Sequence, residues 1–363
     1  MKIVADENMP LVKELFEPFA EVQLIAGRKI TSKHLVDADM LLVRSVTQVN
    51  QSLLQDSKVK FVGSATIGTD HIDQNYLAEQ GIQFVFAPGC NAQAVAEYVL
   101  SAIAYWAQQQ QKDLAQCRVG IIGAGNVGSK VAQVLELLGI ECLLNDPPLA
   151  EQGDSRPFVS LEAIQQCGVV TCHVPLTNNG KHPTYHLIDQ KFLAGMANDS
   201  LLINTSRGAV LDNKAALQSR QAGHNIDFIL DVWENEPDVN LQLMDETLIA
   251  TPHIAGYSQE GKIRGTYQLY QAFCQWQGIE PELTLKELLP QAPKWSVPSQ
   301  PYAQSGVLYQ SLQPFYDIQQ DDSQMRQAFG QISDQVSRHN GETIAEEFDN
   351  LRKNYPQRLE FWS

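Results

Sequence analysis

The chain has 363 residues, of which 44% are hydrophobic and 19% charged, and its formal net charge is −16. This length exceeds one ordinary domain, and the composition is typical of a soluble globular protein. The excess of acid argues against nucleic acid or an anionic membrane as a partner, and it would repel an anionic substrate at long range. Such a substrate must therefore be bound by local arginines or backbone amides.

Targeting and metal signals are missing from the sequence. The first ten residues, MKIVADENMP, lack the apolar core of a signal peptide, and no uncharged apolar run approaches the roughly 20 residues that span a bilayer. The six cysteines form no CxxC pair: they are Cys90, Cys117, Cys142, Cys167, Cys172 and Cys274. We therefore expect no metal site, free thiols and a reducing, cytoplasmic setting.

The first ninety residues alternate short apolar runs with helical patterns. The predicted strands are Lys2–Ala5, Val22–Leu24, Met40–Val43, Phe61–Val62 and Gln83–Phe86, and the predicted helices are Pro10–Phe16, Leu53–Gln55 and Asp73–Gln80. This alternation predicts a parallel sheet. Arg44, Ser45 and Thr66 follow strands, where ligands of open α/β sheets bind, so they could hold an anion. Each taken alone is better explained as a turn or cap residue.

A second α/β region follows the break at Pro88-Gly89. Asn91 can cap a long helix from Ala92 to about Trp106, after which the sequence RVGIIGAGNVG begins. An apolar strand here leads into a glycine-rich turn, a helix, a second strand and finally Asp146. The turn is GAGNVG, residues 123–128, and its candidate cofactor-binding residues are Gly123, Gly125, Asn126, Val127 and Gly128.

This order of elements is typical of a dinucleotide-binding βαβ unit. The first glycine makes the tight turn, the second lets a pyrophosphate approach the backbone, and the third lets helix and strand pack closely. Asp146 lies about twenty residues later, where a carboxylate can accept hydrogen bonds from the adenosine ribose. A carboxylate would repel a 2′-phosphate, so the sequence favours NAD over NADP. The alternative is a doubly wound sheet with an empty crevice.

Later strands deliver three side chains suited to hydride chemistry on a hydroxy acid. Arg207 follows the apolar run Leu201–Asn204, and its planar guanidinium matches a carboxylate bidentately. His253 can take a hydroxyl proton as hydride leaves the same carbon, and Glu236 could hydrogen-bond its other ring nitrogen. Singly, each has an ordinary explanation as a surface arginine, a structural histidine or a turn. Their shared place beside a dinucleotide site favours catalysis.

The segments GAGNVG, INTSRGAVLD, LDVWENEP and TPHIAGYS resemble the signature blocks of the NAD-dependent D-2-hydroxyacid dehydrogenase family, over about residues 1–280. The resemblance implies that Arg207, Glu236 and His253 are catalytic. It also implies two Rossmann-like, doubly wound parallel-sheet domains. These would be a discontinuous substrate-binding domain, 1–92 with 257–280, and an NAD-binding domain, 93–256.

Further segments, among them DENMP, GTDHID, APGCNA and DPP, resemble a branch of this family that acts on a phosphorylated hydroxy acid. This implies substrate contacts by Ser45, Thr66 and Tyr257, with the phosphate toward Arg44, Ser45 and Thr66. It implies an NAD site lined by Asp146, Val174, Thr205, Ser206, Arg207, Asp231 and Gly256. Residues 281–363 would form a small α/β module that mediates homodimerisation. Two alternatives remain open: a dehydrogenase for another D-2-hydroxy acid such as 3-phosphoglycerate, and a non-catalytic NAD sensor like the family's corepressors.

Overall fold

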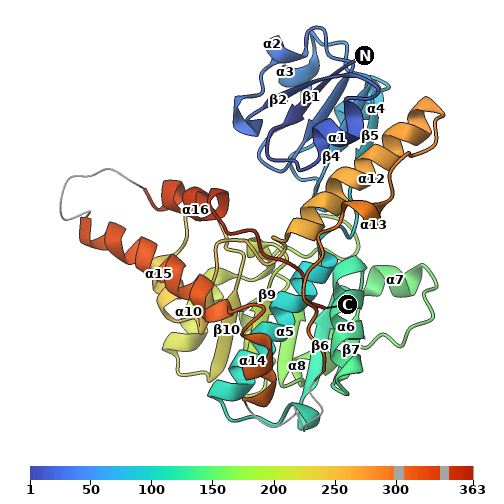
Figure 1. Ribbon diagram of the computed structural model, residues 1–363. Helices are drawn as coiled ribbons and strands as arrows, with labels where there is room; N and C mark the ends of the chain where they lie inside the picture. The colour runs from blue at the N-terminus through green and yellow to red at the C-terminus, as the bar shows by residue number, and fades with distance from the viewer. Residues whose placement is uncertain (298–305, 336–342, 363) are drawn as a thin grey trace. The chain divides into compact units, whose positions relative to one another are not determined.

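The computed structural model describes residues 1–297, 306–335 and 343–362, and the chain divides into two compact units (Figure 1). Unit 1 comprises Met1–Asn91 and Tyr257–Ala292, and unit 2 comprises Ala92–Gly256 and Pro293–Ser363. Both units are built on parallel sheets, as predicted. The assignment of substrate, cofactor and dimerisation roles to separate domains stays a prediction.

Unit 1 contains a five-stranded sheet in the order β2-β1-β3-β4-β5, and all its neighbouring strands pair in parallel. The strands are β1 (Lys2–Asp6), β2 (Glu21–Ile25), β3 (Met40–Val43), β4 (Phe61–Ser64) and β5 (Gln83–Phe86). All five predicted strands are confirmed. Short apolar runs predict them well because a parallel strand covered on both faces needs apolar residues at successive positions.

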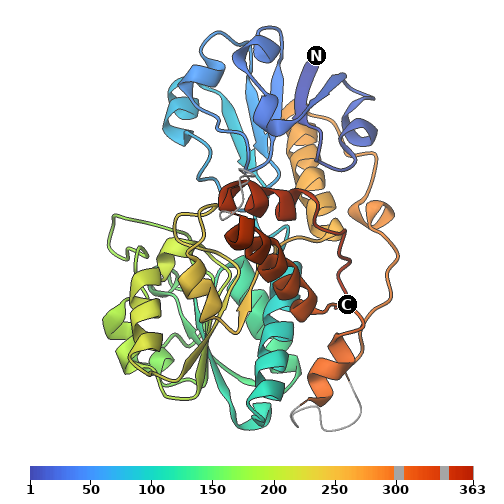
Figure 2. The ribbon, with the colours of Figure 1, turned by 90° about the vertical axis from the view of Figure 1, so that its left-hand side faces the viewer.

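Side chains of the unit 1 strands alternate between two apolar clusters, one on each face of the sheet. Ile3 and Leu42 belong to the cluster beneath α1 (Val12–Phe16) and α12 (Gln259–Gln277), whereas Val4 and Leu41 face the opposite side. That side is covered by α2 (Ser32–Leu35), α3 (Gln51–Leu54) and α4 (Gln74–Glu79). Helix α12 stands beside the sheet (Figure 2), and α13 (Leu285–Leu288) and the 3₁₀ turn η1 (Gly27–Lys29) complete the unit.

Unit 2 contains a six-stranded parallel sheet in the order β11-β10-β9-β8-β6-β7. Its strands are β6 (Arg118–Ile122), β7 (Glu141–Asn145), β8 (Val169–Cys172), β9 (Ser200–Asn204), β10 (Ile226–Leu230) and β11 (Ile249–Ala250). The chain steps from β6 outward to β7 and then returns to place β8 on the other side of β6. This reversal opens a crevice at the carboxyl ends of β6 and β8, where doubly wound sheets bind their ligands.

Helices cover both faces of the unit 2 sheet. They are α5 (Ala92–Gln109), α6 (Asn126–Leu137), α7 (Pro147–Glu151), α8 (Leu161–Gln165), α9 (Gln190–Gly195), α10 (Asn213–Gln221) and α11 (Leu241–Asp245), with 3₁₀ turns η2 (Leu114–Gln116) and η3 (Gly208–Val210). The long helix predicted from Ala92 is confirmed and runs one turn further. Among the described residues, no helix is both long and apolar enough to span a membrane.

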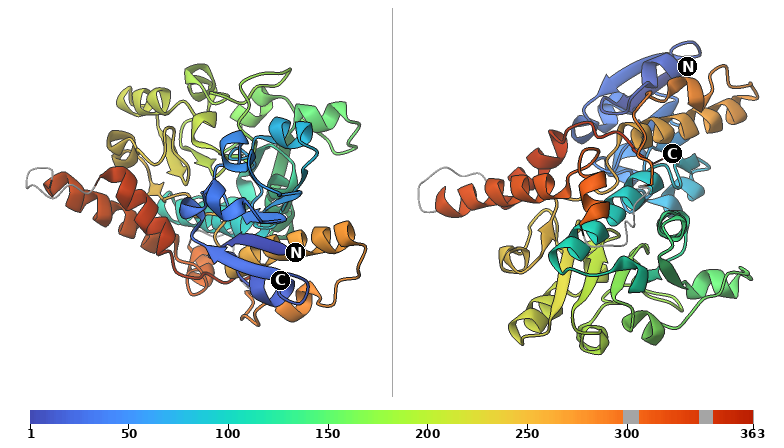
Figure 3. Two further views of the ribbon diagram at one scale, coloured as in Figure 1. Left: turned by 90° about the horizontal axis from the view of Figure 1, so that it is seen from above. Right: turned by 60° about the horizontal axis from the view of Figure 1, so that its bottom comes forward.

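The C-terminal segment, for which the sequence predicts a small α/β module, is helical in its described residues. The described part of residues 293–363 contains three helices and no strand: α14 (Val307–Leu312), α15 (Ile318–Gln335) and α16 (Ile344–Lys353). Helices α15 and α16 lie side by side (Figure 3). Met325 and Phe329 are one helical turn apart and are buried in the unit 2 core with Phe348 of α16. Helical spacing of a few apolar residues, rather than strand alternation, therefore organises this segment.

Polar contacts attach the C-terminal helices to the edge of the unit 2 sheet. Asp322 of α15 accepts a hydrogen bond from the backbone N–H of Ala250 in the edge strand β11, at 2.7 Å. Arg326, one turn later, donates to the carbonyls of Met244 and Thr247, both at 2.9 Å. Helix α15 thus satisfies backbone groups next to an edge strand that would otherwise stay open.

The final residues of the chain are bound to the start of α5. Glu97 is fully buried and accepts hydrogen bonds from the backbone N–H groups of Phe361 and Trp362, at 3.0 and 2.8 Å. Burial raises the pKa of Glu97 to about 7, although the nearby Arg358 acts against this shift. Arg358 donates to the carbonyls of Ala94 and Ala255, at 2.9 and 2.8 Å. The tail therefore supports the loop that follows β11.

Candidate active site

The glycine-rich turn after β6 has the backbone geometry that a dinucleotide site requires. Gly123 has φ of +87°, and a Cβ there would lie 2.6 Å from the carbonyl oxygen of His173, beyond β8. A Cβ on Gly128 would lie 1.9 Å from the carbonyl oxygen of Gly123. A Cβ on Gly125, at the start of α6, would meet none of the described atoms within 4 Å. The first and third glycines are needed for packing, and the second leaves room for a pyrophosphate at the helix N-terminus.

Asp146 is held directly beside this turn. One carboxylate oxygen accepts the backbone N–H of Ala124 at 2.8 Å, and the other accepts that of Leu149 at 3.1 Å, which caps α7. A carboxylate can accept about four hydrogen bonds, so two backbone contacts leave capacity for ribose hydroxyls. The side chain is thus fixed by the protein before any ligand binds.

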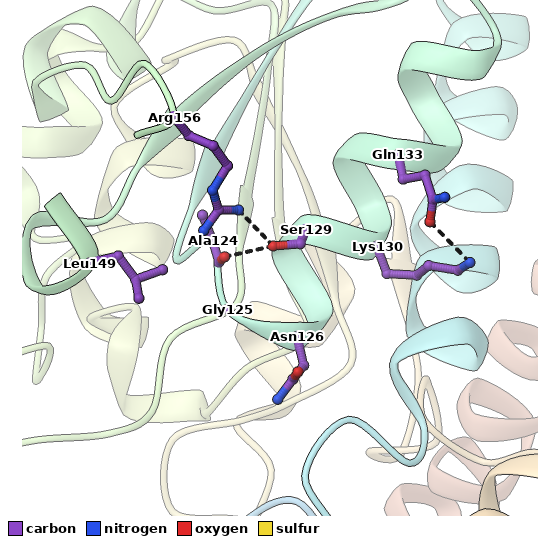
Figure 4. Close-up of a pocket in the computed structure, with 8 residues that line it drawn as sticks. All are labelled: Ala124, Gly125, Asn126, Ser129, Lys130, Gln133, Leu149 and Arg156. Atoms are coloured by element: carbon purple, nitrogen blue, oxygen red, sulfur yellow. Dashed lines mark hydrogen bonds between the residues drawn. The ribbon is translucent and has the colours of Figure 1, made fainter. Parts of the chain in front are cut away.

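A pocket next to the turn carries two cations that the sequence analysis missed (Figure 4). It is lined by Ala124, Gly125, Asn126, Ser129, Lys130, Gln133, Leu149 and Arg156. Arg156 donates to Ser129 Oγ at 2.7 Å and pairs with Asp154 at 2.7 Å, while Ser129 Oγ donates to the carbonyl of Ala124. Asp154 balances the charge of Arg156, so the positive charge beside the glycines that suits an anionic pyrophosphate comes from Lys130. Lys130 could have been recognised from its place two residues after Gly128.

The floor of the crevice is formed where β8 and β9 end. His173 follows β8; its Nδ1 lies 3.2 Å from Thr205 Oγ1, and its Nε2 lies 3.0 Å from Thr171 Oγ1. Burial lowers the pKa of His173 to about 3, so this ring stays neutral at physiological pH. The side chain of Val174 approaches the position of Gly123, since a Cβ there would lie 2.7 Å from Val174 Cγ1. These contacts bring the predicted cofactor residues Val174 and Thr205 together with the glycine-rich turn.

Arg207 extends from a tight turn at the end of β9. Asn204 organises the turn: its side-chain oxygen accepts the backbone N–H and the hydroxyl of Ser206, at 3.1 and 2.8 Å, and its amide donates to the carbonyl of Arg207 at 2.9 Å. Arg207 Nη1 also donates to the carbonyl of Ser206, at 2.8 Å. The half-buried guanidinium is therefore presented by a rigid backbone.

Glu236 and His253 form a close pair. His253 Nδ1 lies 2.5 Å from Glu236 Oε1, and the second carboxylate oxygen accepts the backbone N–H of Trp233 at 3.1 Å. Burial raises the pKa of Glu236, but the charge and hydrogen bond of His253 outweigh it, so the pKa lies below its usual value. His253 has φ of 57°, a conformation uncommon outside glycine and frequent at functional sites. Because Nδ1 faces the carboxylate, Nε2 is the nitrogen available to a substrate.

The loop that carries His253 is anchored by Asp231, which is 1% exposed. Asp231 Oδ1 accepts Thr251 Oγ1 and the backbone N–H of Ile254, both at 2.7 Å, and Oδ2 accepts the N–H of Ala255 at 3.0 Å. The backbone carbonyl of Asp231 accepts the N–H of His253 at 2.7 Å. The family resemblance implies a place for Asp231 in the NAD site, and these contacts also give it a direct part in holding the His253 loop.

A second histidine supports the loop that carries Glu236. His186 Nε2 lies 2.8 Å from Glu234 Oε1, and the other oxygen of Glu234 accepts the backbone N–H of Asn213 at 3.3 Å. The ligand atoms of His186, Asp212 and Glu234 lie within 4.8 Å of one another, a spacing that a metal ion could bridge. The absence of a metal site therefore stays a prediction. No sequence pattern indicates this group, because its members are far apart in the chain.

Three of the four predicted substrate residues lie at the carboxyl ends of unit 1 strands, and the fourth lies just before α12. Arg44 and Ser45 directly follow β3, with Arg44 half-buried and Ser45 exposed. The hydroxyl of Thr66, just after β4, donates to the carbonyl of Gly68 at 2.8 Å and lies 2.7 Å from Ser64 Oγ. Tyr257 lies directly before Ser258, the N-cap of α12. The roles of these four residues stay predictions, as do those of the unit 2 site residues.

Two family models match the chain. Residues 92–255 match the D-isomer specific 2-hydroxyacid dehydrogenase, NAD binding domain, and residues 288–363 match a domain of unknown function, DUF3410. The first match spans the strands, turns and loops that carry the glycine-rich turn, Arg207, Glu236 and His253.

Curated relatives are similar over the whole chain. The chain is 47% identical to the erythronate-4-phosphate dehydrogenase of Tolumonas auensis, over 100% of this chain and 94% of the relative. It is likewise 47% identical to that of Shewanella sediminis, over 99% of this chain and 93% of the relative.

Solved structures show the same fold at lower identity. D-lactate dehydrogenase from Aquifex aeolicus, complexed with NAD and lactic acid, has a TM-score of 0.64 and 23% identity, covering 77% of this chain and 96% of that one. NAD-bound 3-phosphoglycerate dehydrogenase from Entamoeba histolytica has a TM-score of 0.66 and 23% identity, covering 77% and 95%.

Proposed function

The chain belongs to the D-isomer specific 2-hydroxyacid dehydrogenase family, and we propose that it oxidises 4-phospho-D-erythronate with NAD, giving (R)-3-hydroxy-2-oxo-4-phosphooxybutanoate. This reaction belongs to the biosynthesis of pyridoxal 5′-phosphate, vitamin B6. The observation that carries the proposal is the 44–47% identity, over essentially the whole chain, to erythronate-4-phosphate dehydrogenases. The family resemblance predicted from the sequence, its fold and its cofactor are confirmed.

The geometry of unit 2 supports a division of labour among the proposed catalytic residues. Arg207 binds the substrate carboxylate and the C2 oxygen, whose partial negative charge it stabilises as the carbonyl forms. His253 Nε2 removes the proton of the C2 hydroxyl, and Glu236 stabilises the resulting imidazolium through Nδ1. NAD, when bound, accepts the hydride that leaves C2. The proton on His253 then passes to solvent, which regenerates the neutral imidazole.

Residues of the glycine-rich turn and its surroundings suit this cofactor. The turn offers the open side of Gly125 and the N-terminus of α6 to the pyrophosphate, with Lys130 and Arg156 beside it. Asp146 would accept the ribose hydroxyls, and Val174, Thr205, Ser206, Asp231 and Gly256 complete the proposed lining.

The direct test is to incubate the purified protein with NAD and each candidate acid and to follow NADH formation. We expect kcat/KM to be highest for 4-phospho-D-erythronate, above 3-phosphoglycerate and glycerate. A higher value for either rival acid would favour the alternative dehydrogenase. A protein that binds NAD yet turns over none of these acids would fit the sensor alternative, against which the intact Arg207, Glu236 and His253 set argues.

Asp146 is expected to set the preference for NAD over NADP. In Asp146→Ser the carboxylate that repels a 2′-phosphate and binds the ribose is gone. We expect the ratio of kcat/KM for NAD to that for NADP to fall about 10- to 100-fold, since a hydrogen bond to a charged group contributes about 1.5–3 kcal/mol. The matched control is Asp245→Ser, at an exposed aspartate of α11, which should keep the ratio. An equal decrease of kcat/KM with NAD and with NADP would show that Asp146 only caps α7.

We also propose a homodimer that forms through residues 281–363, and a cytoplasmic location. The dimer rests on the resemblance of this segment to the same family branch, and sedimentation of the full-length protein tests it. The location is supported by the cysteines, all six of which are free thiols. We expect no binding to nucleic acid or to a membrane, because the net charge is strongly negative.

A further inference from the structure

Lys262, a residue that the sequence analysis did not select, lies in the first turns of α12. Its ammonium Nζ sits over the ring of Tyr257, 5.2 Å from the centroid, and its side chain is half-buried. Burial lowers the pKa of Lys262, and the charge of Arg44 lowers it further. A second cation therefore stands close to Arg44 at the predicted substrate end of unit 1.

The backbone of unit 1 explains how these two cations meet. Strand β3 pairs with β4, and the N–H of Ala65 donates to the carbonyl of Val43 at 2.9 Å, so the backbone of Arg44 lies beside that of Ala65. Helix α12 packs on the same loop, because a Cβ on Gly265 would lie 3.0 Å from the carbonyl oxygen of Ala65. Lys262 precedes Gly265 by three residues and so shares its face of α12. Arg44 and Lys262 thus both lie near the loop that follows β4.

Neither cation has a carboxylate partner among the described residues. No ion pair within 4.0 Å and no side-chain hydrogen bond joins Arg44 or Lys262 to an aspartate or glutamate in that part of the chain. The protein carries 42 acidic residues against 26 lysines and arginines, so a carboxylate partner could easily have been provided. Two half-buried like charges repel each other unless an anion lies between them. The arrangement therefore favours binding of an anion from outside the chain.

We propose that Lys262 and Arg44 together bind the phosphate group of the substrate. This rests on the proposed function, which supplies an acid with a phosphate at C4 and a carboxylate at C1. The carboxylate is assigned to Arg207, so the phosphate needs a separate cationic subsite. Ser45, next to Arg44, and Thr66, next to Ala65, lie on the loops that the two cations flank. Lys262 is thus a specificity-determining residue, since it recognises the group that distinguishes this substrate from D-erythronate.

The test compares 4-phospho-D-erythronate with unphosphorylated D-erythronate in Lys262→Gln, in Arg44→Gln and in a control. The control is Lys286→Gln, which removes the same charge from an exposed position of α13 in unit 1. We expect Lys262→Gln and Arg44→Gln each to lower kcat/KM for the phosphorylated acid about 10- to 100-fold, mainly through KM. The kcat/KM for D-erythronate should fall much less than that for the phosphorylated acid, and Lys286→Gln should resemble the parent with both acids. Equal losses with both acids, or no loss with either, would overturn the proposal.

Binding of inorganic phosphate tests the proposed subsite without any need for turnover. Calorimetric titration of the parent with phosphate should show binding that is weakened about tenfold or more in Lys262→Gln and kept in Lys286→Gln. If the parent fails to oxidise 4-phospho-D-erythronate, the proposed function falls while Lys262-dependent phosphate binding still supports the anion subsite. If the parent is active but Lys262→Gln binds phosphate as the parent does, the subsite falls and the function stands.

Discussion

Replacing His253 with alanine is expected to lower kcat by about 10²- to 10⁴-fold, the usual contribution of a general base. The imidazole is the group that takes the hydroxyl proton. Among the described residues, its ring hydrogen bonds to Glu236, whose Oε1 lies 2.5 Å from Nδ1. NAD should still bind, because the glycine-rich turn is unaffected. NADH formation at saturating substrate gives kcat, and quenching of protein fluorescence by NAD gives the affinity.

A matched control distinguishes the effect of losing His253 from the effect of losing a histidine elsewhere in the chain. His224→Ala removes an exposed imidazole of unit 2 and should keep the parent's kcat. The kcat of Glu236→Gln should lie between those of His253→Ala and His224→Ala, since an amide can still orient the ring but cannot stabilise an imidazolium by charge. Turnover by His253→Ala at the parent's rate would contradict the proposed mechanism and would require another base.

The strands of both sheets could be predicted from the sequence, whereas several helices could not. Each buried parallel strand is a short apolar run, such as Met40–Val43, that can be recognised without knowing its neighbours. Helix α12 was not predicted: it contains Gly261 and Gly265, which disfavour a helix in isolation. The structure uses both glycines for close packing, since a Cβ on Gly261 would lie 2.7 Å from Ser258 Oγ. Helix α12 is therefore stabilised by tertiary contacts, which a local sequence pattern does not reveal.

The candidate catalytic residues could be selected because each follows a predicted strand, and parallel strands bring their carboxyl ends to one edge. Their supporting partners could not be selected. His186 lies 48 residues before Glu234, and the charge of Arg44 acts on Lys262 because α12 packs on the unit 1 sheet. Electrostatic interactions between residues so far apart in the chain produce no periodic pattern in the sequence. The sequence therefore predicts where the chemistry lies but not what holds it in place.

Asp231→Ala is expected to destabilise unit 2 by at least about 2 kcal/mol, even without NAD. The substitution leaves the buried backbone donors of Ile254 and Ala255 without their acceptor, and each unsatisfied buried group costs about 1–3 kcal/mol. The Thr251 hydroxyl also loses Asp231 but keeps the hydroxyl of Tyr98, 2.8 Å away, as a partner. Loss of this anchor also frees the loop that positions His253, so kcat should fall together with stability. Urea unfolding of the NAD-free protein measures the free energy of unfolding, and NADH formation measures kcat.

Asp231→Asn distinguishes an anchor from a cofactor contact. The asparagine keeps one acceptor oxygen but turns an NH₂ group toward a backbone donor, so its loss of stability should be smaller than that of Asp231→Ala and larger than that of Asp245→Ala, at an exposed position. If Asp231 acted only on NAD, all three variants would unfold in the NAD-free state like the parent, and only NAD affinity would change. A graded loss of stability without NAD would instead place Asp231 among the residues that build the active-site loop, because those donors are present whether or not the cofactor is bound.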